Sequence, residues 1–301
     1  MATYNGSHYI VEQIESIISQ SYNDWQLIIR DDGSSDSTLE IIKKYMSKDN
    51  RIMLIEDSVI CGSPEKNFMK LLSYSTAEFI CFCDQDDIWL REKLTVMLEC
   101  IENRNNSIPQ LVFSDGYLYY NNKSGQLNRL LNARPKQLRD TLFCNGGIHG
   151  SLSMFNSAMR KEMLRNFQFI AMHDHLLTLI GCAHQTITYL EIPTFYYRQH
   201  CGNVTPHVAK NIFIRIFKTL TQNRALYVVD ERYFRGVKSF YDEYRSELSC
   251  LDRRYIELYL DYPQKKMIDR FMSIMLNGFS LNNSKLNLLL KLLIKRYSNF
   301  S

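Results

Sequence analysis

The chain has 301 residues, of which 45% are apolar and 23% are charged, and its formal net charge is +4. These values are ordinary for a globular protein, exclude a disordered or fibrous chain, and leave room for one large domain with an appendage or for two domains. No signal peptide is recognisable and no apolar run reaches the roughly 18 residues of a membrane-spanning helix, so we expect a protein that does not span a membrane.

From residue 7 to about residue 115 the apolar pattern alternates between helical and strand periodicity. Helices are expected to begin near Ser7, Leu39, Ser63 and Leu90. The third start is marked by Ser63-Pro64-Glu65, a hydroxyl cap followed by proline and an acid in the first turn. Strands are expected at residues 25–30, 51–56, 79–83 and 111–113. This alternation predicts an α/β fold built on a doubly wound, mostly parallel sheet.

After residue 120 the pattern is looser. Residues 121–139 are polar and typical of a loop that covers a site. Further elements are expected as a strand at 148–155, helices at 157–167 and 173–182, and two strands at 185–192 and 194–198 around Pro193. From about residue 208 the chain is helical in pattern, and we divide it into an α/β domain of residues 1–207 and a helical C-terminal region of residues 208–301.

Charge is unevenly distributed between these two parts. Residues 208–301 hold 17 Lys or Arg against 9 Asp or Glu, a net charge of +8, which leaves −4 on residues 1–207. A basic segment can contact nucleic acid or an anionic membrane surface. Nothing in it resembles a nucleic-acid-binding module, so we expect membrane contact and no nucleic acid. The terminal stretch Lys285 to Tyr297 is amphipathic, which is typical of an interfacial helix and equally of a helix docked on its own domain.

The eight cysteines, at positions 61, 81, 83, 100, 144, 182, 201 and 250, contain no C-x-x-C pair. Cys81 and Cys83 lie inside an expected buried strand, where they pack as small apolar residues. This usage indicates a reduced, cytosolic chain and not a disulfide scaffold.

An acidic cluster, Asp84-Gln85-Asp86-Asp87, directly follows the apolar run Phe79 to Cys83. Three carboxylates so close together repel one another unless a cation lies among them. Ligands of open α/β sheets bind beyond the carboxyl ends of the strands. The cluster therefore indicates a divalent-metal site that holds an anionic group such as a diphosphate, and the alternative is a solvated acidic turn that caps the next helix.

Other motifs stand around this cluster in a characteristic order. They are Ala2-Thr3-Tyr4-Asn5-Gly6, the run from Arg30 to Thr38 that contains Asp31-Asp32-Gly33-Ser34, Asp84 to Trp89, His173-Asp174-His175, and Tyr197-Arg198-Gln199-His200. The set resembles the family 2 glycosyltransferases of the GT-A fold, close to rhamnosyl- and galactosyltransferase-like enzymes of bacterial surface polysaccharide assembly. The resemblance covers about residues 2–205.

The resemblance implies a nucleotide-diphospho-sugar transferase sheet flanked by helices. It also implies an inverting, metal-dependent transfer of a sugar from a nucleoside-diphosphate donor. The acceptor would be a saccharide or a lipid-linked oligosaccharide of O-antigen, capsule or exopolysaccharide synthesis, at the inner face of the cytoplasmic membrane.

For the donor, the resemblance places Thr3 and Tyr4 against the nucleotide and lets Asp32, with its neighbour Asp31, hydrogen-bond the base or ribose. The alternative for the two aspartates is turn and cap chemistry. Lys66 is placed near the base, although a solvated helix lysine is the ordinary case.

Asp84-Gln85-Asp86 matches the D-x-D motif of the family. Asp86 is expected to bind the metal directly and Asp84 to reach the ribose or a bound water. His200 is expected to complete the metal shell, with a structural histidine after a strand as the equal alternative. Asp87 is expected either to bind a metal-bound water or to cap the next helix. Mg²⁺ or Mn²⁺ suits these ligands, because hard cations prefer carboxylate and phosphate oxygens. Arg198 is expected to contact the diphosphate, since a guanidinium matches phosphate oxygens.

Asp174 stands where the family carries its catalytic base, with a helix cap as the alternative. It would take the proton of the acceptor hydroxyl as the oxygen attacks the sugar carbon from the face opposite the diphosphate. The flanking His173 and His175 are expected to support or pack. Gly146, Gly147 and His173 are placed at the acceptor pocket, where glycine lets the backbone approach a sugar closely. An ordinary glycine loop is the equal alternative for Gly146 and Gly147.

One departure from the family pattern concerns the start of the chain. Family members carry an apolar strand before the Thr-Tyr-Asn element, whereas here Met1 directly precedes Ala2-Thr3-Tyr4. That strand would be central, and its loss would expose backbone groups on two neighbours. We expect a start upstream of Met1; the alternative is a shortened chain with impaired folding or activity.

Two other functions compete with the transferase. One is a catalytically silent nucleotide-sugar-binding or scaffold protein. The other is a nucleotidyltransferase, which is disfavoured because no glycine-rich, lysine-bearing phosphate loop is present.

Overall fold

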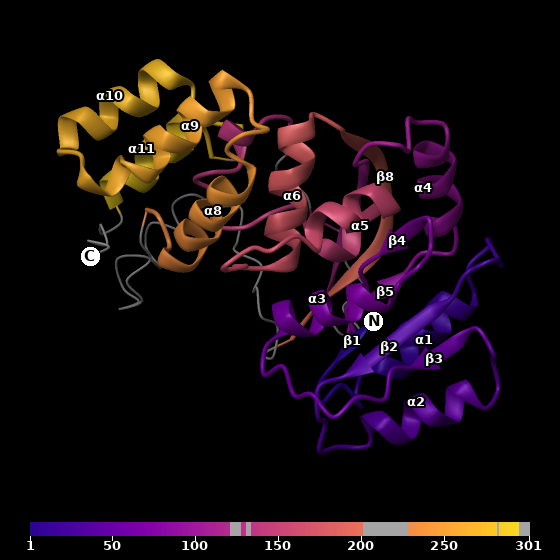
Figure 1. Ribbon diagram of the computed structural model, residues 1–301. Coiled ribbons are helices and arrows are strands. Elements are labelled where there is room, and N and C mark those ends of the chain that lie inside the picture. Colours follow the sequence, from indigo (N-terminus) through magenta and orange to yellow (C-terminus); the bar gives the residue numbers. More distant parts are fainter. Residues whose placement is uncertain (121–127, 131–133, 201–227, 282, 295–301) are drawn as a thin grey trace. The chain divides into compact units, whose positions relative to one another are not determined.

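The computed structural model describes residues 1–120, 128–130, 134–200, 228–281 and 283–294 (Figure 1). The chain forms two compact units. The first comprises residues 1–131, 148–165 and 186–200, and the second comprises residues 132–147, 166–185 and 201–301. The expected boundary between residues 207 and 208 lies outside the described residues.

The first unit begins with a small parallel sheet in the order β1-β2-β3 (Figure 1). Its strands are β1 (Ala2–Thr3), β2 (Leu27–Asp31) and β3 (Ile52–Leu54), and they alternate with α1 (Ile10–Ile18) and α2 (Thr38–Met46). Helix α1 forms as its spacing predicts, because Ile10, Ile14 and Ile17 recur on one face and are buried. The predicted β-α alternation is confirmed in this part of the chain.

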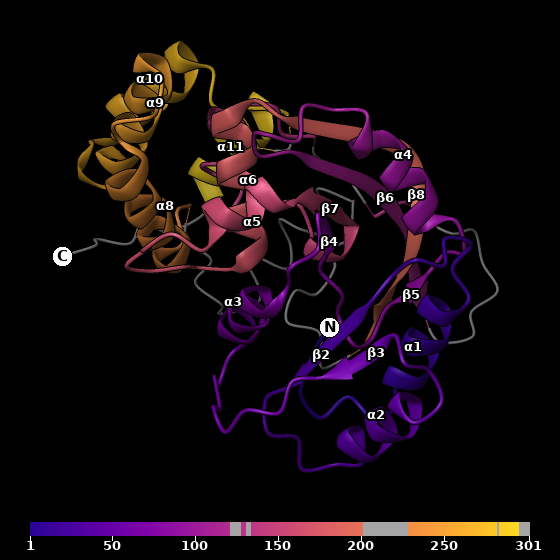
Figure 2. The ribbon, with the colours of Figure 1, turned by 45° about the vertical axis from the view of Figure 1, so that its right-hand side comes forward.

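A second, five-stranded sheet follows, in the order β4-β7-β6-β8-β5 (Figure 2). Its strands are β4 (Phe79–Cys81), β5 (Ile88–Trp89), β6 (Leu111–Tyr120), β7 (Ser153–Asn156) and β8 (Ile187–Gln199). The sheet is mixed: β6 and β8 run parallel, and the other three pairings are antiparallel. Helices α3 (Pro64–Tyr74), α4 (Lys93–Glu102) and α5 (Ser157–Met163) belong to the same unit.

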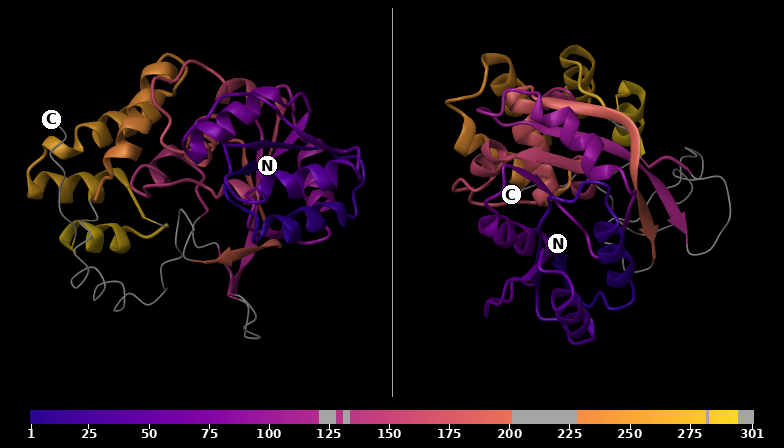
Figure 3. Two further views of the ribbon diagram at one scale, coloured as in Figure 1. Left: turned by 90° about the horizontal axis from the view of Figure 1, so that it is seen from below. Right: turned by 90° about the vertical axis from the view of Figure 1, so that its right-hand side faces the viewer.

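Strand β8 is continuous, so the expectation of two strands separated at Pro193 is wrong. The long ribbon of β8 runs without a break in Figure 3. The chain pairs with β6 on both sides of the proline, and the register shifts between Phe113 and Gly116 of β6, where Asp115 faces Pro193. Proline cannot donate a ladder hydrogen bond, and such residues are tolerated at bulges. The bulge therefore absorbs the proline without ending the strand.

The two sheets of the first unit are separate, and a cavity of about 550 Å³ lies between them. It is lined by Leu27 and Ile28 of β2 and by Phe79 and Ile80 of β4, among others. Strand β1 pairs only with the end of β2, at Arg30 and Asp31. The expectation of residues upstream of Met1 stays a prediction.

The second unit is helical in its described residues. It contains α6 (His173–His184), α8 (Glu231–Tyr244), α9 (Cys250–Leu260), α10 (Met267–Asn277) and α11 (Lys285–Ile294). Phe143 lies at its centre and packs edge-on against Tyr259, Tyr262 and Phe279, at centroid distances of 5.2, 4.9 and 5.2 Å. Within the described parts of the chain, no helix has both the length and the apolar character to cross a bilayer.

Candidate active site

The turn after β2 is built around the carboxylate of Asp31. This group accepts hydrogen bonds from Thr3 Oγ1 at 2.8 Å and from the backbone N–H groups of Gly33 and Ser34 at 3.1 and 2.7 Å. Gly33 has φ +84°, a conformation that glycine adopts at no steric cost. The structure therefore brings Thr3 and Asp31 together, while the side chain of Tyr4 is 58% exposed. Contact of these residues with a nucleotide stays a prediction.

Asp32 is tied to the protein itself. Its two oxygens accept from the backbone N–H groups of Cys61 and Gly62 at 2.6 and 2.8 Å, and Oδ1 also from Arg30 at 3.2 Å. Arg30 is completely buried and binds both oxygens of Asp57 at 2.7 and 3.0 Å. These contacts agree with the turn-chemistry alternative, and a contact of Asp32 with a nucleotide stays a prediction. Lys66 is exposed on α3, and its position near the base of a nucleotide stays a prediction.

The Arg30–Asp57 pair predicts how stability depends on pH. Hydrogen bonds from Arg30 lower the pKa of Asp57 from 3.8 to about 2, although burial opposes the shift. A carboxyl whose pKa is depressed by folding stabilises the protein fully above its unfolded pKa. We expect that stabilisation to be lost as the pH falls from about 4 to about 2. Urea titrations over this range should show a shallower loss in Asp57→Asn; an unchanged slope would contradict the assignment.

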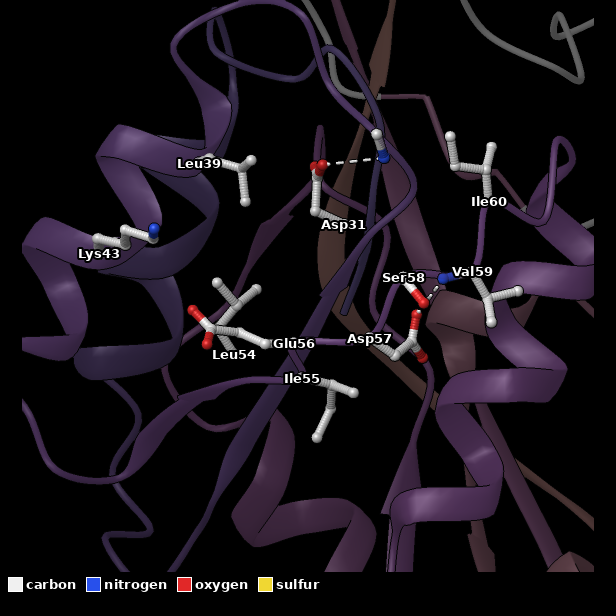
Figure 4. Close-up of a pocket in the computed structure, with 11 residues that line it drawn as sticks. Asp31, Leu39, Lys43, Leu54, Ile55, Glu56, Asp57, Ser58, Val59 and Ile60 are labelled. Carbon is white, nitrogen blue, oxygen red and sulfur yellow. Dashed lines mark hydrogen bonds between the residues drawn. The ribbon is translucent and has the colours of Figure 1, made fainter.

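A cavity of about 320 Å³ lies beside this turn (Figure 4). Figure 4 shows Asp31 on one side of it, Leu39 and Lys43 of α2 on another, and the segment that follows β3 closing the rest. Neither Asp86 nor His200 is among its lining residues. The cavity therefore adjoins the Asp31 turn and is distinct from the acidic cluster.

At the acidic cluster, the structure brings two predicted metal ligands into contact. His200 Nε2 lies 2.8 Å from Asp86 Oδ2, although the residues are 114 positions apart in the chain. The His200 ring stacks on Tyr9 at a centroid distance of 4.4 Å, which fixes its plane. Burial and the charge of Asp84 raise the pKa of Asp86, so a positive partner would stabilise its ionised form.

Asp84 is oriented by Ser151, a residue that was not among the predicted site residues. Ser151 Oγ donates to Asp84 Oδ2 at 2.6 Å. The backbone carbonyl of Ser151 in turn accepts from Lys93 Nζ, and Lys93 is completely buried. The ammonium group lies 4.1 Å from the ring centroid of Trp89. Burial lowers the pKa of Lys93, while nearby thiols and carboxylates oppose the shift.

Asp87 is completely buried, and the backbone N–H of Arg198 donates to its Oδ1 at 3.4 Å. Burial, together with the charges of Asp84 and Asp86, raises its pKa well above the ordinary value. Strand β5 separates it from α4, whose N-cap is Glu92. The alternative that Asp87 caps the next helix is therefore wrong.

Arg198 supports the same turn. Its Nε donates to the backbone carbonyl of Asp86 at 2.9 Å and its NH2 group to Glu12 at 2.8 Å. The guanidinium also lies over the rings of Tyr9 and Tyr119, at 5.2 and 5.1 Å. The residue is only 3% exposed. These contacts hold the backbone of the Asp84–Asp87 turn in place, and contact with a diphosphate stays a prediction.

The chemistry of the cluster fits a divalent cation. Asp86 and His200 offer an oxygen and a nitrogen at one point, with the carboxylates of Asp84 and Asp87 in the same turn. Among the residues that the structure describes, no group of three or more His, Cys, Asp or Glu side chains is arranged to hold a metal. A cation here would complete its coordination with donor oxygens and water, as Mg²⁺ commonly does.

The remaining predicted residues belong to the second unit. Asp174 is the second residue of α6, whose N-cap is Met172, so Asp174 is not the cap. Its Oδ1 is buried and accepts no hydrogen bond from the described residues. A Cβ atom at Gly147 would lie 2.5 Å from the Asp174 carbonyl oxygen, so glycine is needed there for packing, whereas Gly146 faces open space.

The histidines that flank Asp174 are both buried, His173 to 4% exposure and His175 to 2%. The ring of His175 packs edge-on against Tyr233 at 5.0 Å, and burial lowers its pKa to about 3. These observations agree with the expected packing role of His175. The place of His173 in an acceptor pocket stays a prediction.

Sequence reasoning also missed Gln85, whose amide exchanges two hydrogen bonds of 2.9 Å with the backbone of Tyr4. This pairing ties the D-x-D turn to the end of β1. Lys93 did carry a signal, because it shares the buried helical spacing of Met97 and Ile101. Ser151 carried none, since its partner Asp84 is 67 residues away.

Comparison with known proteins agrees with this geometry. Residues 1–167 match the family described as Glycosyl transferase family 2. The dTDP-rhamnosyl transferase RfbG of Shigella flexneri is 32% identical over 224 residues, which cover 67% of this chain and 72% of the relative. The UDP-Glc:alpha-D-GlcNAc-diphosphoundecaprenol beta-1,3-glucosyltransferase WfaP of Escherichia coli is 27% identical over 215 residues, covering 70% and 80%.

The fold is shared with solved glycosyltransferase structures. The mannosyltransferase PcManGT from Pyrobaculum calidifontis, in complex with GDP-Man and Mn²⁺, superposes with a TM-score of 0.52 at 16% identity. The match covers 92% of this chain and 71% of that structure. The predicted GT-A fold class is confirmed, with the refinement that the larger of the two sheets is mixed. This chain is a member of glycosyltransferase family 2.

Proposed function

We propose that this glycosyltransferase moves a sugar from a nucleoside-diphosphate donor to a hydroxyl group with inversion at the anomeric carbon, and that the reaction depends on Mg²⁺ or Mn²⁺. The observation that carries the proposal is the contact of Asp86 with His200 at 2.8 Å, at the end of a turn crowded with carboxylates. A carboxylate oxygen and an imidazole nitrogen that lie this close together can both coordinate a divalent cation that also binds a diphosphate.

One set of residues would act on the leaving group, and another would act on the acceptor. Asp86 and His200 would hold the cation, and Asp84 and Thr3 would line the nucleotide side, with Asp31 shaping the turn. When bound, the cation neutralises charge on the departing nucleoside diphosphate. Gln85 and Ser151 keep the D-x-D turn in position through their bonds to Tyr4 and Asp84.

Asp174 is proposed as the general base. The acceptor oxygen forms a bond to the sugar C1 while the bond from C1 to the diphosphate oxygen breaks. The acceptor proton passes to Asp174, and the electron pair of the broken bond leaves with the nucleoside diphosphate. A single displacement of this kind inverts C1. The buried Oδ1 of Asp174, which accepts no hydrogen bond from the described residues, supports this role because its lone pairs remain available.

The names of the relatives suggest the substrates. RfbG is named as a dTDP-rhamnosyl transferase, and WfaP is named for transfer of glucose from UDP-Glc to alpha-D-GlcNAc-diphosphoundecaprenol. We propose a nucleoside-diphosphate hexose as donor and a saccharide or undecaprenol-diphosphate-linked oligosaccharide of surface polysaccharide synthesis as acceptor. An acceptor of that kind would be met in the cytoplasm, at the inner face of the cytoplasmic membrane, with the basic residues of the segment 208–301 toward the lipid.

A donor screen tests this function. Thermal unfolding of the full chain should be followed with UDP-glucose, dTDP-rhamnose and GDP-mannose, each with and without Mn²⁺. A bound ligand raises the melting temperature, so one donor should do so only with the metal present. Release of nucleoside diphosphate in the presence of a lipid-linked acceptor would establish the transferase. Metal-dependent binding with no turnover on any acceptor would favour the silent, scaffold alternative.

Ser151 offers a sharper test of the D-x-D turn. Ser151→Ala removes the hydroxyl that orients Asp84, and loss of such a supporting bond typically costs 10- to 100-fold, so we expect the transfer rate to fall by roughly that factor. Ser153→Ala is the matched control, because its buried hydroxyl bonds the carbonyl of His149 and not the cluster. Equal rates in the two variants, both folded by circular dichroism, would contradict the role of Ser151.

A further inference from the structure

Helix α10 presents its apolar side chains outward. Their exposed fractions run from 43% to 77%, and they are Met267, Ile268, Phe271, Met272, Met275 and Leu276. These positions follow the spacing i, i+1, i+4, i+5, i+8 and i+9, which places all six on one half of the helix surface. We call this set the α10 apolar face.

The opposite side of α10, which is buried, is largely polar. Its buried residues are Arg270, Ser273 and Ile274. Arg270 donates from Nε to the carbonyl of Tyr262 at 3.2 Å and from its NH2 group to the carbonyl of Pro263 at 2.6 Å. The helix is thus anchored by its polar side, which is the reverse of a helix that packs only on its own domain.

Charge around this helix has one sign. Residues 262–301 contain seven Lys or Arg against one acid, Asp269, a net charge of +6. Lys266 is the exposed residue directly before the helix, and Lys285 is the exposed first residue of α11. By contrast, residues 228–261 hold six basic and eight acidic side chains. Among the described basic residues of this stretch, Arg270 is buried, Lys265 pairs with Asp261 at 3.4 Å and Lys291 donates to the carbonyl of Phe143, so the exposed positive charge is that of Lys266 and, on α11, Lys285.

We propose that the α10 apolar face inserts into the surface of an anionic lipid bilayer. Large exposed apolar faces mark interaction sites, and an apolar helix face flanked by lysines is typical of helices that lie in the membrane interface. Eleven residues span only about 16 Å, too short to cross the hydrocarbon core, so the helix lies along the surface. The stem of Lys266, directly before the helix, can lie along the acyl region while its ammonium group reaches the phosphates.

A second copy of the chain is the main competing occupant. A twofold dimer would place the same face of both copies together. That arrangement would bring the exposed lysines beside the two faces, such as Lys266, toward one another, and like charges across an interface are unfavourable. Anionic lipid headgroups supply the opposite charge and attract basic residues near the surface. The charge therefore favours the bilayer.

Vesicle flotation of the full chain tests the proposal. Wild type should float with vesicles of phosphatidylcholine mixed with phosphatidylglycerol, float less with phosphatidylcholine alone, and be released by rising salt. The double variant Ile268→Asn/Leu276→Gln removes two side chains that are 77% and 75% exposed. Its partition coefficient should fall tenfold or more, since burying one such side chain contributes about 1.5–3 kcal/mol when complete.

The matched control is Leu251→Gln in α9, a residue of the same unit that is 54% exposed and lies off the α10 apolar face. It should float like wild type, and all variants should keep the wild-type melting temperature. Flotation of the double variant at the wild-type level would overturn the proposal, as would failure of wild type to float. Loss of a concentration-dependent dimer in sedimentation velocity, without vesicle binding, would assign the face to a second copy.

This inference deepens the membrane contact proposed above and is independent of donor chemistry. Donor binding, measured by thermal shift on the same variants, should be unchanged. A failed flotation with normal donor binding would overturn only the bilayer contact. Failed donor binding with normal flotation would overturn only the proposed transfer.

Discussion

Replacing Asp86 with asparagine should lower the rate of sugar transfer roughly 10³-fold and remove its dependence on Mg²⁺ or Mn²⁺. The amide keeps the shape of the side chain and its contact with His200 but loses the negative charge. A cation contributes several kcal/mol of charge stabilisation to the departing diphosphate, and each 1.4 kcal/mol or so corresponds to a factor of ten. The turn itself should stay folded, because Arg198 holds the backbone carbonyl of Asp86 and not its carboxylate.

The measurement is the initial rate of nucleoside diphosphate release against metal concentration, together with donor-induced thermal shift. Asp24→Asn is the matched control, an exposed aspartate of the same unit that lies outside the cluster. Its metal dependence should equal that of wild type. A folded Asp86→Asn protein with unchanged metal dependence would show that the cation binds elsewhere or takes no part.

Replacing Asp174 with asparagine should lower kcat by roughly 10²–10⁴, the range that a positioned general base supplies. The affinity for the donor should be unchanged, because the residue is proposed to act on the acceptor hydroxyl. Asparagine cannot accept that proton, and Asp174→Glu should restore part of the rate. The acidic limb of the pH–rate profile should disappear in the asparagine variant, since that limb reports protonation of the base.

The effect on stability of removing a negative charge from the first turn of a helix needs a separate control. Asp174 lies in the first turn of α6, where an acid also interacts favourably with the helix dipole. Asp269 occupies the first turn of α10 in the same unit and has no proposed catalytic part. Asp269→Asn should therefore match the small stability change of Asp174→Asn while keeping full activity. A fall in kcat in both variants, or in neither, would remove Asp174 from its role as base.

Local pattern was sufficient for most of the fold. The β-α alternation of the first hundred residues, the start of α3 at Ser63-Pro64 and the helices after residue 228 follow from side-chain periodicity and cap chemistry, which act between near neighbours. The family could be recognised for a similar reason: its motifs are short and stand in a characteristic order. The antiparallel pairings of β7 could not be foreseen, because strand direction depends on partners far along the chain.

In the candidate site, too, motifs identify individual residues, whereas contacts between distant segments depend on the tertiary structure. Asp84, Asp86, Asp174 and His200 could be named from motifs, and the contact between Asp86 and His200 agrees with their joint assignment. Residue pattern alone does not determine whether Asp32 faces a nucleotide or the protein. In the structure its carboxylate accepts hydrogen bonds from the backbone amides of Cys61 and Gly62. That outcome depends on how the segment after β3 returns to β2, a non-local property.

The sequence by itself determined the family, the order of the elements and the identity of the chemically active side chains, because these depend on residue type and spacing. Only the tertiary structure decided which groups support them. Ser151 binds Asp84 from a short turn that lies 67 residues further along the chain, and Lys93 binds the backbone carbonyl of Ser151. It also decided that α10 turns its apolar face outward, because the Tyr262 and Pro263 carbonyls bind Arg270 and so fix which side of the helix is buried.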